Sequence, residues 1–185
     1  MRIVAGKYRS RKLNSVTGLN TRPTADRIKE AIYSSLGTYF DGGWMLDLFA
    51  GSGNMGLEGL SRGMSRVVFV DKDKEAIRII KENVANLKVE SECEIWKLDY
   101  QDALEKCKTD GYKFRLIYLD PPYAYDEFEK IMLWIEENEL LDYNGVVVVE
   151  NRKEDEYRID YQELETYKEA CYGIAKIRYF RRKEK

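Results

Sequence analysis

The chain has 185 residues, 44% of them hydrophobic and 35% charged, with a formal net charge of −2. Such a composition is typical of one globular domain with a well-solvated surface, and it excludes a disordered chain. The lack of histidine and the three scattered cysteines exclude the commonest metal ligand and a four-cysteine zinc site, so we expect chemistry without a metal.

Residues 1–22 are predicted to form a short basic hairpin, because apolar and basic residues there are interrupted by glycine and asparagine. Residues 1–24 hold six Lys or Arg and no Asp or Glu, whereas acidic residues crowd the middle and later chain. A basic segment on an acidic body is typical of a protein that meets an anionic partner on one face. An ordinary solvated surface strand is the alternative that charge alone leaves open.

Strands and helices are predicted to alternate after this segment. A helical spacing of apolar residues runs from Ile28 to Phe40, and Thr24 can cap its start. We then expect strands at 44–49, 67–70, 94–98, 115–119 and 146–149, helices ending near 61 and spanning 74–87 and 128–141, and an antiparallel pair at 161–167 and 174–180. The alternation predicts an α/β domain over residues 23–185, with a doubly wound, seven-stranded, mostly parallel sheet and an antiparallel C-terminal hairpin.

Acidic residues follow the ends of successive predicted strands, at Asp71, Asp99 and Asp120, and Asp47 lies close to the end of the first. In an open parallel sheet, ligands bind outside the carboxyl ends of the strands, so we expect these carboxylates on one rim. A single aspartate at such a position is often a helix cap. Several aspartates at the same edge as the loop Gly51-Ser52-Gly53 favour a ligand site instead.

The glycine loop alone fits two kinds of site. The run from Gly51 to Gly56 satisfies the spacing of a dinucleotide-binding loop, and Asp71 lies where such a fold places its ribose-binding acid. A nicotinamide-dependent oxidoreductase or another nucleotide-binding module is therefore a competing hypothesis. Asp47, which can fix the loop and approach the amino-acid end of a methyl donor, favours S-adenosylmethionine.

The segment Asp120-Pro121-Pro122-Tyr123 directly follows an apolar strand. Two consecutive prolines impose an extended backbone and remove two donors, which leaves the Asp120 carboxylate and the Pro121 carbonyl as acceptors. Two acceptors match the two hydrogens of an exocyclic amino group, and Tyr123 offers a face on which a base can stack. With the glycine loop, this segment predicts methyl transfer to an exocyclic nitrogen of a nucleobase. A rigid turn that caps the next helix is the alternative.

Several further segments form a recognisable order: Met1-Arg-Ile-Val-Ala-Gly6, Arg11-Lys-Leu13, Asn20-Thr-Arg-Pro-Thr24, Leu46-Asp-Leu-Phe-Ala-Gly-Ser-Gly53, Gly56-Leu-Glu-Gly-Leu-Ser-Arg-Gly63, Val68-Phe-Val-Asp71 and Leu119-Asp-Pro-Pro-Tyr123. This order resembles the RsmD family of bacterial 16S ribosomal RNA guanine-N2 methyltransferases, over about residues 1–150. The third segment, together with the Leu-Ser-Arg-Gly63 end of the fifth, narrows the resemblance, because the glycine loop and Asp-Pro-Pro-Tyr are shared with many methyltransferases. The chain departs from the family at Asn151, where relatives more often carry histidine.

The resemblance implies a Rossmann-like class I methyltransferase that transfers a methyl group to the N2 amine of guanine 966 in 16S ribosomal RNA. It implies that Asp47 and the glycine loop hold the methionine part of S-adenosylmethionine, Asp71 the ribose and Asp99 the adenine. The cofactor-binding set is then Asp47, Phe49, Ala50, Gly51, Ser52, Gly53, Asp71, Lys72, Asp99 and Tyr100. The catalytic set is Asp120, Pro121 and Tyr123, and the substrate-binding set is Arg9, Arg11, Lys12, Arg22, Thr24 and Pro122.

Further expectations concern the target base, the product, the partner and the cellular location of the protein. The same pair of acceptors, Asp120 and the Pro121 carbonyl, would serve an adenine-N6 methyltransferase acting on DNA or RNA. Only the N-terminal segment and the small size favour ribosomal RNA. We expect S-adenosylhomocysteine as the product, and 16S rRNA in the small subunit or an assembly intermediate as the partner. No apolar run reaches the roughly 20 residues of a membrane span, and no signal peptide is visible, so we expect a cytoplasmic monomer away from membranes.

Overall fold

The structure is a computed structural model that describes residues 1–16, 23–122, 125–156 and 160–185, with only the backbone of residues 23–24 and 125–126. It has two compact units, Met1–Ala103 and Leu104–Lys185. Its seven strands form a mixed sheet that is accompanied by helices, which confirms the predicted Rossmann-like class. Among the described helices, none is both long and apolar enough to cross a membrane.

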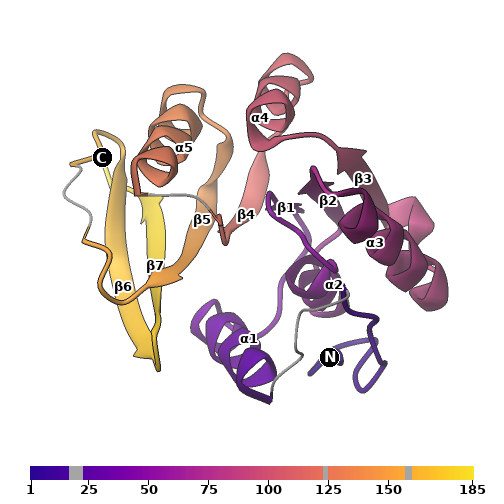
Figure 1. The fold of residues 1–185 in the computed structure, drawn as a ribbon. Coiled ribbons are helices and arrows are strands. Elements are labelled where there is room, and N and C mark those ends of the chain that lie inside the picture. The colour runs from indigo at the N-terminus through magenta and orange to yellow at the C-terminus, as the bar shows by residue number, and fades with distance from the viewer. Residues whose placement is uncertain (17–22, 123–124, 157–159) are drawn as a thin grey trace. The chain divides into compact units, whose positions relative to one another are not determined.

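The first unit holds three parallel strands in the order β3-β2-β1: β1 (Trp44–Asp47), β2 (Arg66–Asp71) and β3 (Cys93–Lys97). Two helices connect these strands and pack on them, α2 (Asn54–Ser61) on β1 and β2, and α3 (Lys74–Leu87) on β2 and β3 (Figure 1). Because the three strands run the same way, their carboxyl ends meet at one edge. The glycine loop and the segments that begin at Asp71 and Asp99 lie at that edge.

Helix α3 shows why the predicted elements form. One face is buried along its length, by Ala76, Ile77, Ile80, Val84 and Leu87. Asp73 caps the first turn with its side chain, which accepts a 2.7 Å hydrogen bond from the Glu75 N–H. Lys88 ends the helix in the left-handed conformation. Apolar spacing and caps agree here, and the observed bounds are the predicted ones, 74–87.

The second unit holds β4 (Phe114–Leu119), β5 (Leu141–Arg152), β6 (Leu164–Tyr172) and β7 (Ala175–Arg182), in the order β4-β5-β7-β6, together with α5 (Tyr125–Glu137). β4 and β5 are parallel, and β7 is antiparallel to both of its neighbours. The predicted antiparallel C-terminal hairpin is thus confirmed, and it is the yellow pair in Figure 1. Leu119 pairs with Val149, so Asp120, which follows β4, lies near the level of Glu150 in β5.

Several elements differ from the prediction. α1 (Pro23–Ser35) ends before 40, because Gly37 and Thr38 take the left-handed conformation at φ 104° and 71°. α4 (Tyr100–Thr109), which was not predicted, follows β3, and a short 3₁₀ helix, η1 (Glu90–Glu92), precedes it. β5 begins at Leu141, a residue that the prediction placed in the preceding helix.

The N-terminal residues form a hairpin with one isolated bridge, between Arg2 and Lys12. Two backbone hydrogen bonds extend this pairing, from Ile3 N–H to the Arg11 carbonyl at 2.9 Å and from Leu13 N–H to the Met1 carbonyl at 3.0 Å. We call residues 1–14 the basic arm. The arm belongs to the first compact unit.

Candidate active site

The glycine loop turns tightly between β1 and α2. Gly51 and Gly53 have φ of 58° and 83°, a region that favours glycine because it has no side chain. The Ala50 N–H donates to the Val70 carbonyl at 2.9 Å, and the Gly53 N–H closes a turn onto the Ala50 carbonyl at 2.8 Å. The loop backbone is therefore held against β2 at the carboxyl edge of the sheet.

Asp47 lies beneath this loop and is 1% exposed. Its Oδ2 accepts a 3.1 Å hydrogen bond from the Gly56 N–H, whereas Oδ1 is buried and has no hydrogen-bond partner among the described residues. Burial raises the pKa of Asp47 to about 7; the Gly56 hydrogen bond opposes that rise and the charge of Asp71 adds to it. A buried acceptor without a donor is costly, so this oxygen is suited to receive a cationic or hydrogen-bonding ligand group.

Asp71 ties the end of β2 to the glycine loop. Its Oδ2 accepts from the Gly51 N–H at 2.9 Å, and its Oδ1 accepts from the Asp73 N–H at 2.9 Å. Each carboxylate oxygen can accept more than one hydrogen bond, so both retain acceptor capacity for a ligand hydroxyl.

Asp99 begins α4. Its Oδ1 accepts from the Asp102 N–H at 2.9 Å, which is the hydrogen bond of a helix cap. The ring of Tyr100 lies 5.8 Å from the ring of Phe49, at an interplanar angle of 46°. This contact joins residues that follow β3 and β1, both of them in the predicted cofactor set. Lys72, also in that set, is exposed.

The residues that we expect to hold the amine, Asp120, Pro121 and Pro122, belong to the second unit, and we call them the amine-clamp segment. Asp120 directly follows β4 and is exposed, Pro121 is half-buried and Pro122 is exposed. Next to it in the sheet, the Tyr118 hydroxyl donates to the Glu150 carboxylate. Tyr123, the predicted stacking residue, lies outside the described residues.

The predicted substrate residues of the arm lie on the surface of the first unit. Arg9, Arg11 and Lys12 are all exposed. The Arg11 guanidinium donates to the Asn86 carbonyl of α3 at 2.7 Å. Arg22 and the side chain of Thr24 lie outside the described residues.

Four buried polar residues of the first unit were not predicted: Lys29, Glu58, Arg62 and Asn83, each at most 2% exposed. Glu58 pairs with Arg62 at 2.9 Å and with Lys29 at 3.2 Å. Burial lowers the pKa of Lys29, while Glu58 opposes that shift. The sequence signal that could have identified Glu58 is its place within Leu57-Glu58-Gly59-Leu60, in an otherwise apolar helix.

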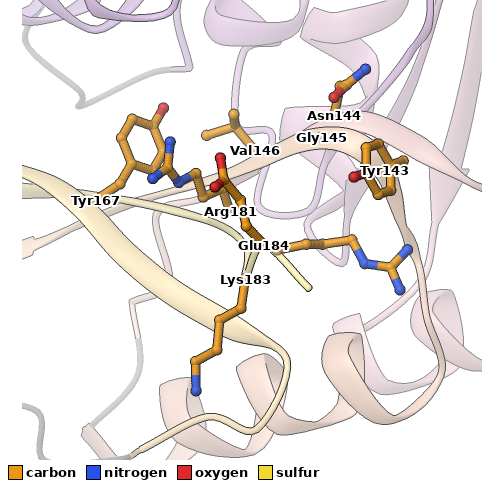
Figure 2. Close-up of a pocket in the computed structure, with 9 residues that line it drawn as sticks. Tyr143, Asn144, Gly145, Val146, Tyr167, Arg181, Lys183 and Glu184 are labelled. Atoms are coloured by element: carbon orange, nitrogen blue, oxygen red, sulfur yellow. The ribbon is translucent and has the colours of Figure 1, made fainter.

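The second unit also contains a cavity of about 320 Å³ that none of the predicted residues lines. Figure 2 shows the Tyr167 ring beside Arg181, whose guanidinium carbon is 5.1 Å from the ring centre. The other lining residues are Tyr143, Asn144, Gly145, Val146, Arg182, Lys183 and Glu184. Val146 pairs with Leu116, so the cavity lies toward the opposite end of β4 from Asp120. It is separate from the amine-clamp segment.

The side chains beside the glycine loop suit an organic cofactor better than a metal ion. Among the described residues, no group of His, Cys, Asp or Glu is placed to hold a metal ion. Asp47 and Asp71 instead present oxygens beside a glycine loop, and such oxygens suit an ammonium group and sugar hydroxyls. S-adenosylmethionine carries both groups.

Comparisons with known proteins also indicate a methyltransferase. The Haemophilus influenzae ribosomal RNA small subunit methyltransferase D is 34% identical over 97% of this chain and 93% of its own length. A candidate rRNA methyltransferase of Bacillus subtilis, YlbH, is 36% identical over 99% of this chain and all of its own. A solved structure of a candidate methyltransferase from Escherichia coli covers 100% of this chain and 99% of its own at 28% identity, with a TM-score of 0.84.

A family model described as Conserved hypothetical protein 95 matches residues 1–181, which is nearly the whole chain. The match includes the basic arm, the glycine loop and the amine-clamp segment, and it extends past the stretch on which the motif resemblance was based. The chain therefore belongs to the RsmD family of ribosomal RNA methyltransferases.

Proposed function

We propose that this protein transfers a methyl group from S-adenosylmethionine to the exocyclic N2 amine of a guanine in 16S ribosomal RNA, with guanine 966 as the target implied by its family. The observation that carries the proposal is Asp47, a buried carboxyl with one unpartnered oxygen beneath a glycine loop. Relatives named as small-subunit rRNA methyltransferases, similar over almost their full length, support the choice of RNA.

Residues of the first unit would hold the cofactor. Asp47 Oδ1 would accept from the ammonium group of the methionine part, and Asp71 would accept from the ribose hydroxyls with its remaining lone pairs. Phe49 and Tyr100 would pack against the adenine, whose amino group would reach Asp99. When bound, S-adenosylmethionine supplies a methyl group on a positively charged sulfur, and S-adenosylhomocysteine is the product.

Residues of the second unit would hold the base. Asp120 and the Pro121 carbonyl would accept hydrogen bonds from the two N–H groups of the guanine amine, which directs the nitrogen lone pair away from the ring. The Asp120 carboxylate would take up the proton that the nitrogen loses when it gains the methyl group. Catalysis would arise mainly from positioning and from this acceptor pair, and it needs no covalent enzyme intermediate. The target base must leave its stack to reach the clamp, and Tyr123 would give it a new stacking partner.

Mapping the methyl group tests the proposal. Small ribosomal subunits that lack the modification would be incubated with the protein and labelled S-adenosylmethionine, and the label mapped by nucleoside analysis and primer extension. We expect N2-methylguanine at one position of 16S rRNA. Label in N6-methyladenine, with DNA as a parallel substrate, would instead establish the adenine-N6 alternative.

A binding measurement separates the proposal from the oxidoreductase alternative. Calorimetric titration with S-adenosylhomocysteine should show binding, and titration with NAD should show none. Binding of NAD alone would overturn the proposal, because the Asp-Pro-Pro-Tyr segment has no use in a dinucleotide site.

A further inference from the structure

Asn83 connects the basic arm to the glycine loop through its side-chain amide. It lies on α3, is 1% exposed, and its Oδ1 accepts a 2.7 Å hydrogen bond from the Asn14 N–H. Its Nδ2 donates to the Asn14 carbonyl at 3.0 Å and to the Ser52 carbonyl at 2.9 Å. One buried amide thus holds both backbone groups of an arm residue and the middle carbonyl of the glycine loop.

A second buried link joins the other end of the arm to the residue that follows the loop. Glu58 accepts from the Val4 N–H at 2.9 Å and from the Ala5 N–H at 3.1 Å. Lys29 Nζ donates to the Arg2 carbonyl and to Asn54 Oδ1, each at 2.7 Å. The start of the arm is therefore tied to α2, which follows the loop, and the end of the arm is tied through Asn83 to the loop itself.

The exposed cations of the arm lie on the stretch of backbone that these links hold in place. Lys7, Arg9 and Lys12 lie between the two anchored ends, and their side chains are exposed. Gly6, in the same stretch, packs so closely on α2 that an added Cβ would lie 2.0 Å from the Ser61 carbonyl oxygen. The position of the cations is therefore set by the contacts of the arm with α2 and α3.

We propose that Asn83 is a positioning residue that couples the basic arm to the donor-binding loop, so that a bound donor stabilises the docked arm and RNA bound to the arm strengthens donor binding. The inference rests on the proposed function for the identities of donor and RNA. A buried hydrogen-bond network leaves costly unpaired groups when one member moves, so arm and loop favour one joint arrangement. Coupling between two binding sites is reciprocal by thermodynamic linkage.

Hydrogen exchange of arm amides tests the coupling. Ile3 and Leu13 report on the arm because their N–H groups bond within it and not to Asn83. Adding S-adenosylhomocysteine should slow exchange of both amides by about fivefold or more in the wild type, as expected for ordinary coupling between sites. In Asn83→Ala the same addition, at a concentration that saturates this variant, should leave their exchange rates unchanged.

Asn86→Ala is the matched control. Asn86 is an exposed asparagine on the same helix, and it holds Arg11 through its backbone carbonyl, which the substitution keeps. Slowing should persist in this variant. Asn83→Asp is a second variant, which keeps the acceptor for the Asn14 N–H and removes the donor to the Ser52 and Asn14 carbonyls. It should lose the slowing as Asn83→Ala does, and it serves if the alanine variant does not fold.

The outcomes separate this inference from the proposed function. Binding of S-adenosylhomocysteine without slowed exchange in the wild type would overturn the coupling and leave the proposed methylation standing. Equal slowing in Asn83→Ala would overturn the role of Asn83. No binding of S-adenosylhomocysteine to the wild type would overturn both. As the reciprocal readout, small-subunit RNA should strengthen S-adenosylhomocysteine binding in the wild type but not in Asn83→Ala.

Discussion

Asp47 sits beneath the glycine loop with a pKa near 7, raised chiefly by burial. Near neutral pH its carboxyl is therefore close to the midpoint between the neutral and the charged form. The charged form pairs far better with a ligand ammonium, because the hydrogen bond then joins opposite charges in a buried place. Donor binding should accordingly remove a proton from Asp47.

We expect the affinity for S-adenosylhomocysteine to rise with pH below 7, by up to about tenfold per pH unit, because one proton must leave Asp47 on binding. Above about pH 7 the rise should level off, because Asp47 is then already mostly charged before the ligand binds. Calorimetric titrations between about pH 5.5 and 8.5 give the profile. Asp47→Asn should bind weakly and show no rise below pH 7; a rise that persists in this variant would assign the titration to another group.

Asp120 offers a test of the clamp that is independent of the cofactor. Asp120→Ala should leave the affinity for S-adenosylhomocysteine near normal, because all of the predicted cofactor residues belong to the first unit. Turnover should fall by about 10²-fold or more, as when a positioned proton-handling group is lost. Single-turnover methylation assays beside calorimetry separate the two quantities. Equal losses in both would show that Asp120 is a structural residue.

Single residues differ in how well the sequence alone could predict them. The place of Asp47, Asp71 and Asp99 at one edge could be predicted because each lies at or just after the end of a predicted strand, and strand ends of a parallel sheet share an edge. The contacts of Glu58 and Asn83 with the basic arm could not, because these partners are 53–54 and 69 residues away along the chain. The apolar helix around Glu58 marks it as unusual, but no local pattern identifies a distant backbone partner.

Helix α2 packs against β1 and β2 at very short range. At Gly56 an added Cβ would lie 2.3 Å from Phe69 Cε1 and 2.8 Å from Val67 Cγ1. In an open helix, replacing glycine with alanine stabilises by about 1 kcal/mol. Here the overlap should outweigh that gain, because the neighbouring side chains belong to a buried strand and have little room to move.

Gly56→Ala should lower the free energy of unfolding by about 1–3 kcal/mol, as measured by chemical denaturation. The double variant Gly56→Ala with Phe69→Leu tests the cause, because the smaller ring-free side chain makes room for the methyl group. It should be more stable than the sum of the two single effects predicts. Strict additivity would place the cost of the alanine elsewhere than at Phe69.

At the level of elements, apolar spacing predicted α3 to the residue because its caps and its buried face agree. It failed for α4, where only Ala103, Leu104 and Cys107 are buried within a strongly charged segment. It also failed at the start of β5. Leu140 and Leu141 continue the apolar spacing of α5, and the register with β4 shifts between Phe114 and Leu116, so a periodic pattern could not locate the boundary.

At the level of the whole molecule, the predicted cofactor residues belong to one compact unit and the amine-clamp segment belongs to the other. The sequence shows no linker near the division, which lies within α4. The basic arm was predicted as a separate extension, and its backbone is tied by buried side chains to the unit that holds the glycine loop. The arm would thus contact RNA from the same unit that we propose holds the donor, whereas the residues that we propose hold the base belong to the other unit.

Salt dependence tests whether the exposed cations of the arm contact RNA. Each phosphate contact made by Lys or Arg contributes about one unit to the slope of log affinity against log salt, through the release of counterions. Arg9→Ala and Lys12→Ala should each weaken binding of small-subunit RNA and lower the slope by about 1, while the affinity for S-adenosylhomocysteine stays unchanged. Lys108→Ala, at an exposed lysine at the end of α4, is the control and should keep the full slope. An unchanged slope in the arm variants would return Arg9 and Lys12 to an ordinary solvated surface, and the RNA would then have to bind through other cations.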